Sequence, residues 1–465
     1  MKHAFRLGAV LALAAGPALA APPAEPSRAF SVPVEYHKLE NGLKVVLSPD
    51  HTAPTAVVAV YYNIGFRIEP RDRTGFAHLF EHMMFQGSGN LGKMEFIRLV
   101  QSNGGVLNGS TRFDFTDYFE IVPSHTLETM LWAEADRMRG LAITRENLEN
   151  QQGVVTNEVK VNVLNQPYGG FPWLDLPQYA NTNWHNAHNF YGDLKDLEAA
   201  SLDDVKAFFA AYYAPNNAAL VMTGDIDPAQ TLAWVEKYFG GIPAAASKPK
   251  PDLSEPRQER EKRASKQDPL AKRPALAVGY HMPRSDTPEY YAMGLLDQVL
   301  LQGKDSRLYQ ALVQRTGLTG SVDGGINPDL GNMFNINGPT LWVAYLIHDA
   351  DKTPDQILKA IDTEVEALRT KPVDQATYDL ALIKVRSALY DAIDRSFGFG
   401  RADLLASFAL FDDDPAKINR LESEFRKVTP ELMLKTAREY LRPGNRTVLL
   451  VEPKAETRPA PQAGS

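Results

Sequence analysis

The sequence predicts an α+β protein made of two related halves, each a β-sheet layered with helices. Two observations predict this class: strand-like runs alternate with helical patterns along the chain, and one capped helix–turn–strand unit occurs twice. The 465 residues are too many for one ordinary core, so two or three domains are expected. Hydrophobic residues make up 44% and charged residues 23%, a composition typical of globular and not of disordered chains.

The first twenty residues have the pattern of a cleaved secretory signal. Lys2 and Arg6 precede an apolar run, Leu7–Ala15, and the segment ends in Ala18-Leu19-Ala20. The run is too short for a membrane anchor. We therefore expect residues 1–20 to be removed and the mature protein to be exported without an anchor, to the periplasm if the source is a Gram-negative bacterium.

Charge and cysteine content exclude several classes of function. The formal charge is −8, and removal of two basic residues with the signal makes it −8 − 2 = −10. No basic field exists that would hold nucleic acid or anionic lipid. The chain has no cysteine, which excludes thiol catalysis, cysteine-bound zinc, a cysteine-linked lipid anchor and disulfides.

Predicted elements follow in order after a Pro/Ala-rich spacer. The run TAVVAVYYNIG reads as a strand, a helical pattern starts at Thr74, and FTDYFEIVP alternates as a hairpin strand does. The remaining predictions for this half are helices over 124–164, a loop rich in Asn, Tyr, Trp and Gly over 165–192, and a capped helix, turn and strand over 201–228.

The last of these units recurs near the end of the chain. Tyr212 and Pro215 match Tyr440 and Pro443, an offset of 228 residues, and the run at 56–65 resembles the run at 274–283. Two copies of one α+β domain are the natural interpretation. The predicted domains are 21–242 and 275–465, joined by a polar, proline-punctuated linker over 243–274.

The stretch HLFEHMMF places two histidines four residues apart. On a helix, His78, Glu81 and His82 share one face, so two imidazoles could hold one metal ion while the carboxylate reaches a bound water. A buried helix that happens to carry polar residues is the alternative. The apolar flanks weaken it, because unpaired imidazoles and carboxylates are costly to bury.

A catalytic zinc site needs a third protein ligand. The segment 146–163 reads as a helix and offers Glu146, Glu149 and Glu158. Glu158 follows an apolar Val-Val step, but composition alone does not choose among the three.

The chain resembles the pitrilysin–insulysin family of zinc peptidases, which carry the inverted motif H-x-x-E-H. It is most similar to the small two-domain branch that includes bacterial processing proteases and mitochondrial processing peptidase. The stretches that carry the resemblance cover nearly the whole mature chain: 65–90, 104–123, 131–138, 154–160, 165–169, 212–227 and 303–318.

The resemblance implies a zinc-dependent endopeptidase that hydrolyses peptides or unfolded segments and holds one Zn²⁺ per chain. It implies His78, His82 and Glu158 as ligands and Glu81 as general base. The family often has a second glutamate seven residues before the third ligand, where this chain has Gln151. The alternative is a non-catalytic assembly or peptide-binding subunit of a two-subunit peptidase.

The resemblance also implies where substrate and partners bind. Asn108 and Tyr118 match residues that line the cleft beside an edge strand, where peptides bind by β-addition. The second half has no H-x-x-E-H, and Thr319 stands where relatives carry a substrate-holding Tyr. We therefore expect half of a clamshell chamber that is completed by a dimer, preferably a heterodimer with a homologous chain that lacks the motif.

Overall fold

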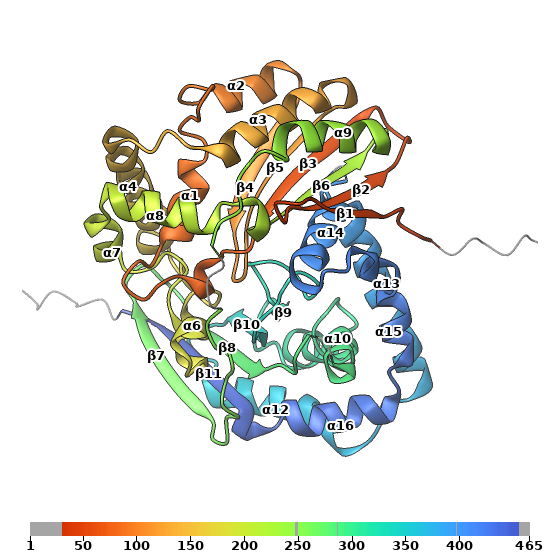
Figure 1. Ribbon diagram of the computed structural model, residues 1–465. Coiled ribbons are helices and arrows are strands. Elements are labelled where there is room, and N and C mark those ends of the chain that lie inside the picture. Colours follow the sequence, from red (N-terminus) through yellow and green to blue (C-terminus); the bar gives the residue numbers. More distant parts are fainter. Residues whose placement is uncertain (1–29, 247–249, 286, 397, 455–465) are drawn as a thin grey trace, which may run out of the picture. The chain divides into compact units, whose positions relative to one another are not determined.

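A computed structural model describes residues 30–246, 250–285, 287–396 and 398–454. The predicted signal peptide, residues 1–20, lies outside these residues. Two β-sheets organise the described chain, one from each half of the sequence, and helices pack on both (Figure 1). Among the described residues, no helix has the length and apolarity needed to cross a membrane.

The first sheet has the strand order β1-β2-β6-β3-β5-β4. Its strands are β1 (Glu35–Lys38), β2 (Lys44–Pro49), β3 (Thr55–Tyr62), β4 (Val106–Thr111), β5 (Thr116–Pro123) and β6 (Ala218–Gly224). The pair β2–β6 is parallel and the other pairs are antiparallel. As predicted from their alternating patterns, β4 and β5 form a hairpin, and β4 is an edge strand.

The second sheet repeats this arrangement in the order β7-β11-β8-β10-β9. Its strands are β7 (Lys262–Asp268), β8 (Ala275–His281), β9 (Asp323–Ile326), β10 (Leu341–Ile347) and β11 (Arg446–Pro453). Here β7–β11 is the parallel pair, and β11–β8, β8–β10 and β10–β9 are antiparallel. Strands β2, β6, β3, β5 and β4 thus correspond in order to β7, β11, β8, β10 and β9, which confirms the predicted internal repeat.

One part of the predicted linker is wrong. Lys262–Asp268, inside the predicted 243–274 segment, is strand β7 at the edge of the second sheet. Its sequence KRASKQD is polar except for Ala264, and its side chains are alternately exposed. Edge strands tolerate such sequences because only one of their sides is paired, so hydrophobic patterning did not reveal it.

Helices of the first half cover mainly one face of the first sheet. The helices of this half are α1 (Phe76–Met83), α2 (Glu95–Ser102), α3 (Leu127–Arg139), α4 (Arg145–Val159), α5 (Asp175–Ala180), α6 (Trp184–Ala187), α7 (Leu194–Ala199), α8 (Leu202–Tyr212) and α9 (Pro228–Phe239). A π-helical turn, Lys160–Leu164, continues α4. The segment predicted as a loop over 165–192 contains the short helices α5 and α6, which are too brief for a periodicity argument.

Helices of the second half are α10 (Pro288–Leu300), α11 (Arg307–Tyr309), α12 (Pro354–Thr370), α13 (Gln375–Asp394), α14 (Phe399–Asp412), α15 (Leu421–Lys427) and α16 (Pro430–Tyr440). The repeated unit is α8–β6 in one half and α16–β11 in the other. Ser201 caps α8 and Thr429 caps α16, each accepting a hydrogen bond from the backbone three residues on.

Each sheet is also covered by a helix from the opposite half. Helix α14 packs on β2, β3 and β6, and the short α5 packs on β7, β8 and β11 (Figure 1). Along β3, Val58 and Val60 enter the core shared with α1 and α3, whereas Val57 and Ala59 enter the core shared with α14. Both faces of the first sheet are therefore buried.

A buried carboxyl at this contact gives a pH-dependent stability. Asp117 of β5 is 1% exposed and accepts a hydrogen bond from Ser110. Burial raises its pKa to about 7, against the favourable charge of Arg112 and with a further increase from Asp403 of α14. Because this value exceeds that of the unfolded chain, about 3.9, the native state holds the proton more tightly.

We expect the stability that Asp117 contributes to be full below pH about 4 and to be lost as the pH rises to about 7. The amide side chain of the Asp117→Asn variant cannot ionise, so the variant does not lose this stability as the pH rises. The free energy of unfolding of the variant minus that of the wild type should therefore increase by on the order of 2 kcal/mol between pH 5 and 8. Urea unfolding at a series of pH values measures this. Parallel pH profiles for the two proteins would contradict the assignment.

Candidate metal centre

Helix α1 begins at a cap provided by a buried carboxylate. Glu69 accepts hydrogen bonds from the backbone N–H of Gly75 (2.9 Å) and Ala77 (2.5 Å), groups that the first turn of a helix leaves unpaired. Gly75 has φ of 81°, a left-handed conformation that favours glycine. Burial raises the pKa of Glu69, and the neighbouring His188 opposes this increase. The start of α1 is thus set by a residue six positions before its N-cap, Gly75.

The helix divides its side chains between the core and the site. Phe76, Leu79, Phe80 and Met83 are buried in the core of the first half. In addition, the Tyr118 hydroxyl donates to the Phe80 carbonyl (3.0 Å). With the apolar face held against the sheet, His78, Glu81 and His82 lie together on another side of the helix.

The structure selects one of the three candidate glutamates on α4. Glu146 and Glu149 are exposed, whereas Glu158 faces the two histidines. Val155 and Val159, on either side of Glu158, are buried and set the rotation of the helix. His78, His82 and Glu158 are the one group of three or more potential metal ligands found within the described residues.

The distances in this cluster fit a single zinc ion. His78 Nε2 lies 3.5 Å from Glu158 Oε1, and His82 Nε2 lies 3.1 Å from Glu158 Oε2. Two ligand atoms at about 2.1 Å from a tetrahedral zinc are about 3.4 Å apart, so both histidine–carboxylate distances are close to the required separation. One donor atom from each of the three residues lies within 4.8 Å of the other two. One acidic and two imidazole ligands are a common catalytic zinc set.

The protonation states also suit metal binding. Burial lowers the pKa of His78, which favours the neutral imidazole that binds metals. Burial alone would raise the pKa of Glu158, but the hydrogen bond from His82 and the charges of both histidines bring it below its usual value. The side chains of His82 and Glu158 are 21% and 27% exposed, so water and substrate can reach the cluster.

Aromatic residues from the 184–191 segment orient His78 and Glu158. The rings of Phe190 and Tyr191 lie 5.2 and 5.1 Å from the ring of His78, and the Tyr191 hydroxyl is 3.3 Å from Glu158 Oε1. Burial raises the pKa of Tyr191 to about 12, so its hydroxyl remains a donor. Tyr191 therefore holds the carboxylate of Glu158, the predicted third ligand.

Gln151, which stands where the family often has a second glutamate, contacts a neighbour on its own helix. Within the described residues, the hydrogen bond of its side-chain nitrogen goes to Asn150 Oδ1 (2.8 Å) and not to a ligand. His78 Nδ1 is buried and has no hydrogen-bond partner in the described part of the chain. Packing by aromatic rings, more than a second hydrogen bond, fixes the His78 ring.

The two residues predicted to line the cleft, Asn108 and Tyr118, lie in different surroundings. Asn108 is exposed on the edge strand β4. The prediction that Tyr118 lines the cleft is wrong, because Tyr118 is 0% exposed and its hydroxyl contacts Phe80 and Tyr213 (3.2 Å). The alternation of β5 points this ring to the core beneath α1, so Tyr118 supports the helix that carries His78 and His82.

His185 and His188 lie outside the cluster. His188 stacks on Trp184 at 4.2 Å and lies 3.7 Å from Glu69, while His185 Nδ1 contacts the Arg67 carbonyl at 2.9 Å. The same short segment therefore contacts both Glu69, which caps α1, and, through Tyr191, Glu158. Sequence reasoning did not identify Glu69 or Tyr191, since neither has a regular spacing from the motif.

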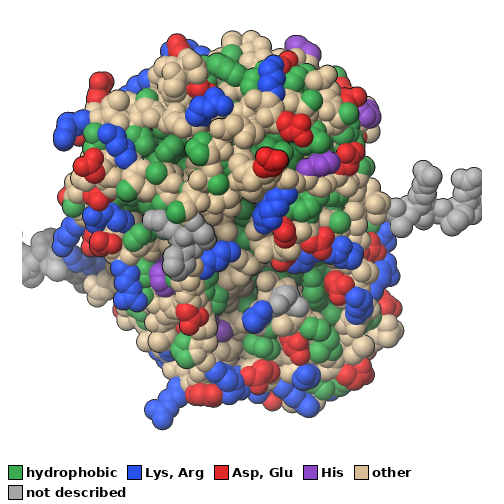
Figure 2. All heavy atoms as spheres, in the orientation of Figure 1, with side chains coloured by type: hydrophobic (Ala, Val, Ile, Leu, Met, Phe, Trp, Pro, Cys, Tyr) green, Lys and Arg blue, Asp and Glu red, His purple; other side chains and the backbone are tan. Residues whose placement is uncertain are grey.

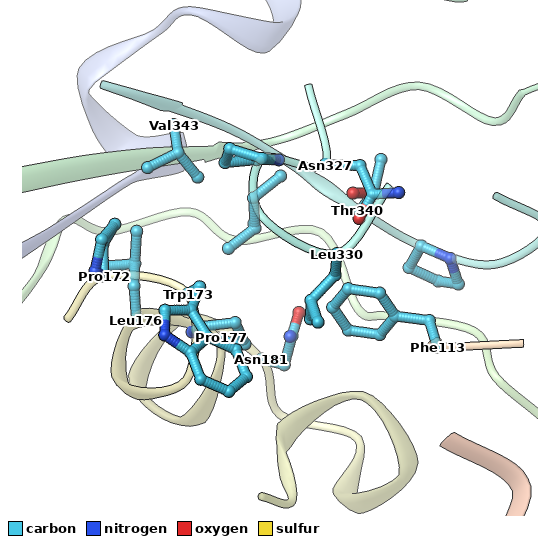
Figure 3. Close-up of a pocket in the computed structure, with 13 residues that line it drawn as sticks. Phe113, Pro172, Trp173, Leu176, Pro177, Asn181, Asn327, Leu330, Thr340 and Val343 are labelled. Atoms are coloured by element: carbon cyan, nitrogen blue, oxygen red, sulfur yellow. The ribbon is translucent and has the colours of Figure 1, made fainter. Parts of the chain in front are cut away.

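The residues that line an apolar pocket (Figure 3) include none of the three members of the cluster. The lining of this pocket comes from Phe113, the segment around α5, and the second sheet with the loop before β10, including Trp173, Leu176, Leu330 and Val343. Trp173 packs edge-on to Tyr191, which packs edge-on to His78.

On the face shown in Figure 2, acidic and basic side chains are interspersed.

Comparison with known proteins identifies the class. Residues 44–169 match Insulinase (Peptidase family M16), and residues 199–384 match the Peptidase M16 inactive domain. The chain belongs to peptidase family M16, as the resemblance to pitrilysin and insulysin implied.

Individual relatives agree with this assignment. The chain is 26% identical to zinc protease PqqE of Helicobacter pylori, over 89% of this chain and 92% of that protein. It is 21% identical to mitochondrial-processing peptidase subunit beta of Saccharomyces cerevisiae, over 77% and 78%. The crystal structure of a protease from Helicobacter pylori has the same fold, with a TM-score of 0.83 at 24% identity, covering 91% of this chain and 100% of that one.

The contact between Tyr191 and Glu158 predicts an effect on metal affinity. Tyr191→Phe keeps the ring against His78 and removes the hydroxyl, so zinc binding should weaken by about tenfold. Competition with a chromophoric chelator measures this. Tyr168→Phe is the matched control, because its hydroxyl donates to the distant Arg273 carbonyl (2.7 Å). Equal zinc affinities for the two variants would contradict the role of Tyr191.

Proposed function

We propose that this protein is a zinc-dependent endopeptidase that cleaves peptides or unfolded segments of polypeptide. The observation that carries the proposal is the convergence of His78, His82 and Glu158 from two helices at zinc-ligand separations. Glu81, on the same helix as both histidines, has its carboxylate beside this cluster and is not needed as a ligand. Family membership supports the same reaction, since PqqE is named a zinc protease.

In the proposed hydrolysis, three residues hold the metal ion and Glu81 transfers the proton. A zinc ion held by the three ligands would supply a Lewis acid that makes water more acidic and polarises a carbonyl. Glu81 accepts a hydrogen bond from Thr111 at Oε2 (2.8 Å), and within the described residues Oε1 receives none. Oε1 is thus the atom that takes the proton from water and later returns it to the leaving amine.

An edge strand beside the cluster supports an extended peptide as substrate. Strand β4 pairs with β5 on one side only, so its other side offers backbone N–H and C=O groups. Asn108 is exposed on this strand. A peptide added to β4 would be bound mainly through main-chain hydrogen bonds, which demand little sequence specificity. Export of the protein, which the N-terminal pattern predicts, would place this activity outside the cytoplasm.

A non-catalytic subunit is the second candidate. Its support is the match of residues 199–384 to an inactive M16 domain and the replacement of the second glutamate by Gln151. Subunits of this kind typically lose the motif, whereas all four site residues are present here and gathered. Peptide hydrolysis and zinc content distinguish the two candidates.

Glu81→Gln should reduce kcat on an unstructured fluorogenic peptide by at least about 100-fold, because a neutral amide cannot accept the proton. The variant should still bind one zinc per chain, since the three ligands are unchanged. Zinc content is measured by elemental analysis of the purified protein.

The matched control is Glu149→Gln on α4. Glu149 is exposed and is not part of the cluster, so this variant should retain activity. Full activity of Glu81→Gln would rule out the proposed mechanism. An inactive wild type that nevertheless binds peptide would favour the non-catalytic candidate.

A partner chain belongs to the same proposal. The edge of β4 is unpaired in this chain, and Thr319 replaces the Tyr with which relatives hold substrate. The yeast relative is by name one subunit of its peptidase. We therefore propose a dimer, preferably with a homologous chain that lacks H-x-x-E-H and supplies the missing contacts.

Light scattering after size-exclusion chromatography should give a mass of two chains when the protein is co-expressed with such a homologue. Specific activity should then exceed that of the protein alone. A monomer that is fully active and gains nothing from any homologue in the same genome would rule out the heterodimer.

A further inference from the structure

We infer that Thr111 is a positioning residue that holds the carboxylate of Glu81 for proton transfer. This inference rests on the proposed function and adds a residue to its site. Thr111 is the last residue of β4, 30 residues from Glu81 in sequence, and its hydroxyl lies 2.8 Å from Glu81 Oε2.

The direction of this hydrogen bond follows from chemistry. An ionised carboxylate only accepts hydrogen bonds, so the hydroxyl of Thr111 must be the donor. The other oxygen near this hydroxyl, the Ala77 carbonyl, is 3.5 Å away, which is too long for a strong bond. The single proton of Thr111 is therefore committed to Glu81.

Burial makes the contact specific. Thr111 is 2% exposed, so water does not compete for its hydroxyl. A hydrogen bond to a charged acceptor in such surroundings is stronger than one between neutral groups. The hydrogen bond from Thr111 occupies Oε2 of Glu81 and leaves Oε1 oriented for a water molecule. Without this hydrogen bond the carboxylate would rotate about the last torsion of the side chain, which has a broad energy minimum.

Thr111 also connects the proposed peptide-binding strand with the proposed general base, Glu81. Thr111 and the exposed Asn108 belong to the same edge strand. A peptide that pairs with β4 restrains the strand that holds Glu81. Thr111 should thus matter for the rate of the chemical step more than for the affinity of the substrate.

Three variants test this role. Thr111→Val has nearly the same shape and lacks the hydroxyl, and Thr111→Ser restores the hydroxyl. Thr116→Val is the matched control: Thr116 is the register partner of Thr111, is 0% exposed, and donates its hydroxyl to the Ile64 carbonyl (2.7 Å) outside the site.

With a fluorogenic peptide, Thr111→Val should lower kcat by about 10- to 100-fold and leave KM within about twofold. Thr111→Ser and Thr116→Val should each keep kcat within about threefold of the wild type, and all variants should bind one zinc per chain. A kcat for Thr111→Val equal to that of Thr116→Val, or no rescue by serine, would overturn the inference.

A second measurement does not depend on activity. In the zinc-free protein, the urea midpoints of Thr111→Val, Glu81→Ala and the double variant form a double-mutant cycle. The two single shifts should not add, because each removes the same hydrogen bond. Additive shifts would overturn the inference. A wild type without peptidase activity would overturn the proposed function, and the cycle would still decide whether Thr111 holds Glu81.

Discussion

Burial of both faces of the first sheet is the constraint on which the rest of the structure depends. The central strand β3 is buried from Ala56 to Tyr62, with alternate side chains entering two different cores. Helices of the first half cover one face, and α14 from the second half covers the other. The hydrophobic effect therefore requires both halves of the chain to form a complete core around this sheet.

Specific polar contacts fix how α14 lies on the sheet. Lys44 of β2 donates to the carbonyl oxygens of Ala409 (2.7 Å) and Leu410 (3.2 Å) near the C-terminus of α14, where a helix favours a cation. The Tyr61 hydroxyl of β3 donates to Asp403 at 2.9 Å. These bonds give the apolar contact a single register.

On the opposite face, a buried charge cluster supports the site. The Arg137 guanidinium of α3 pairs with Glu134 and Glu120 and lies 3.7 Å from the centroid of Phe96. It also lies 5.2 Å from the ring of Tyr118, whose hydroxyl binds the backbone of α1. A continuous series of contacts thus runs from α3 through β5 to α1, the helix that carries both histidines of the cluster.

The two halves share the same arrangement of sheet and following helix, but that helix carries different side chains in each half. Helix α10 follows β8 as α1 follows β3, but every residue of α10 from Tyr290 to Leu300 is buried. Where α1 presents two histidines, α10 has Asp297, which accepts a hydrogen bond from the Trp342 indole (2.7 Å) in the core. The repeat therefore preserves the sheet and its helix, and the potential metal ligands occur in one copy.

The sequence by itself determined the repeat, the main strands and the two histidines of the motif. These depend on local periodicity and on spacing within one helix, which a sequence displays directly. It left Glu146, Glu149 and Glu158 open on residue type alone, and family resemblance was needed to favour one of them.

The tertiary structure decided what depends on contacts between distant segments. It placed Glu158 at the cluster, turned Tyr118 into the core, and brought Glu69, Thr111 and Tyr191 to the site. It also showed that the polar segment Lys262–Asp268 is a strand, because an edge position does not require apolar side chains. Such roles follow from packing and hydrogen bonding across the fold, and no pattern within a single segment encodes them.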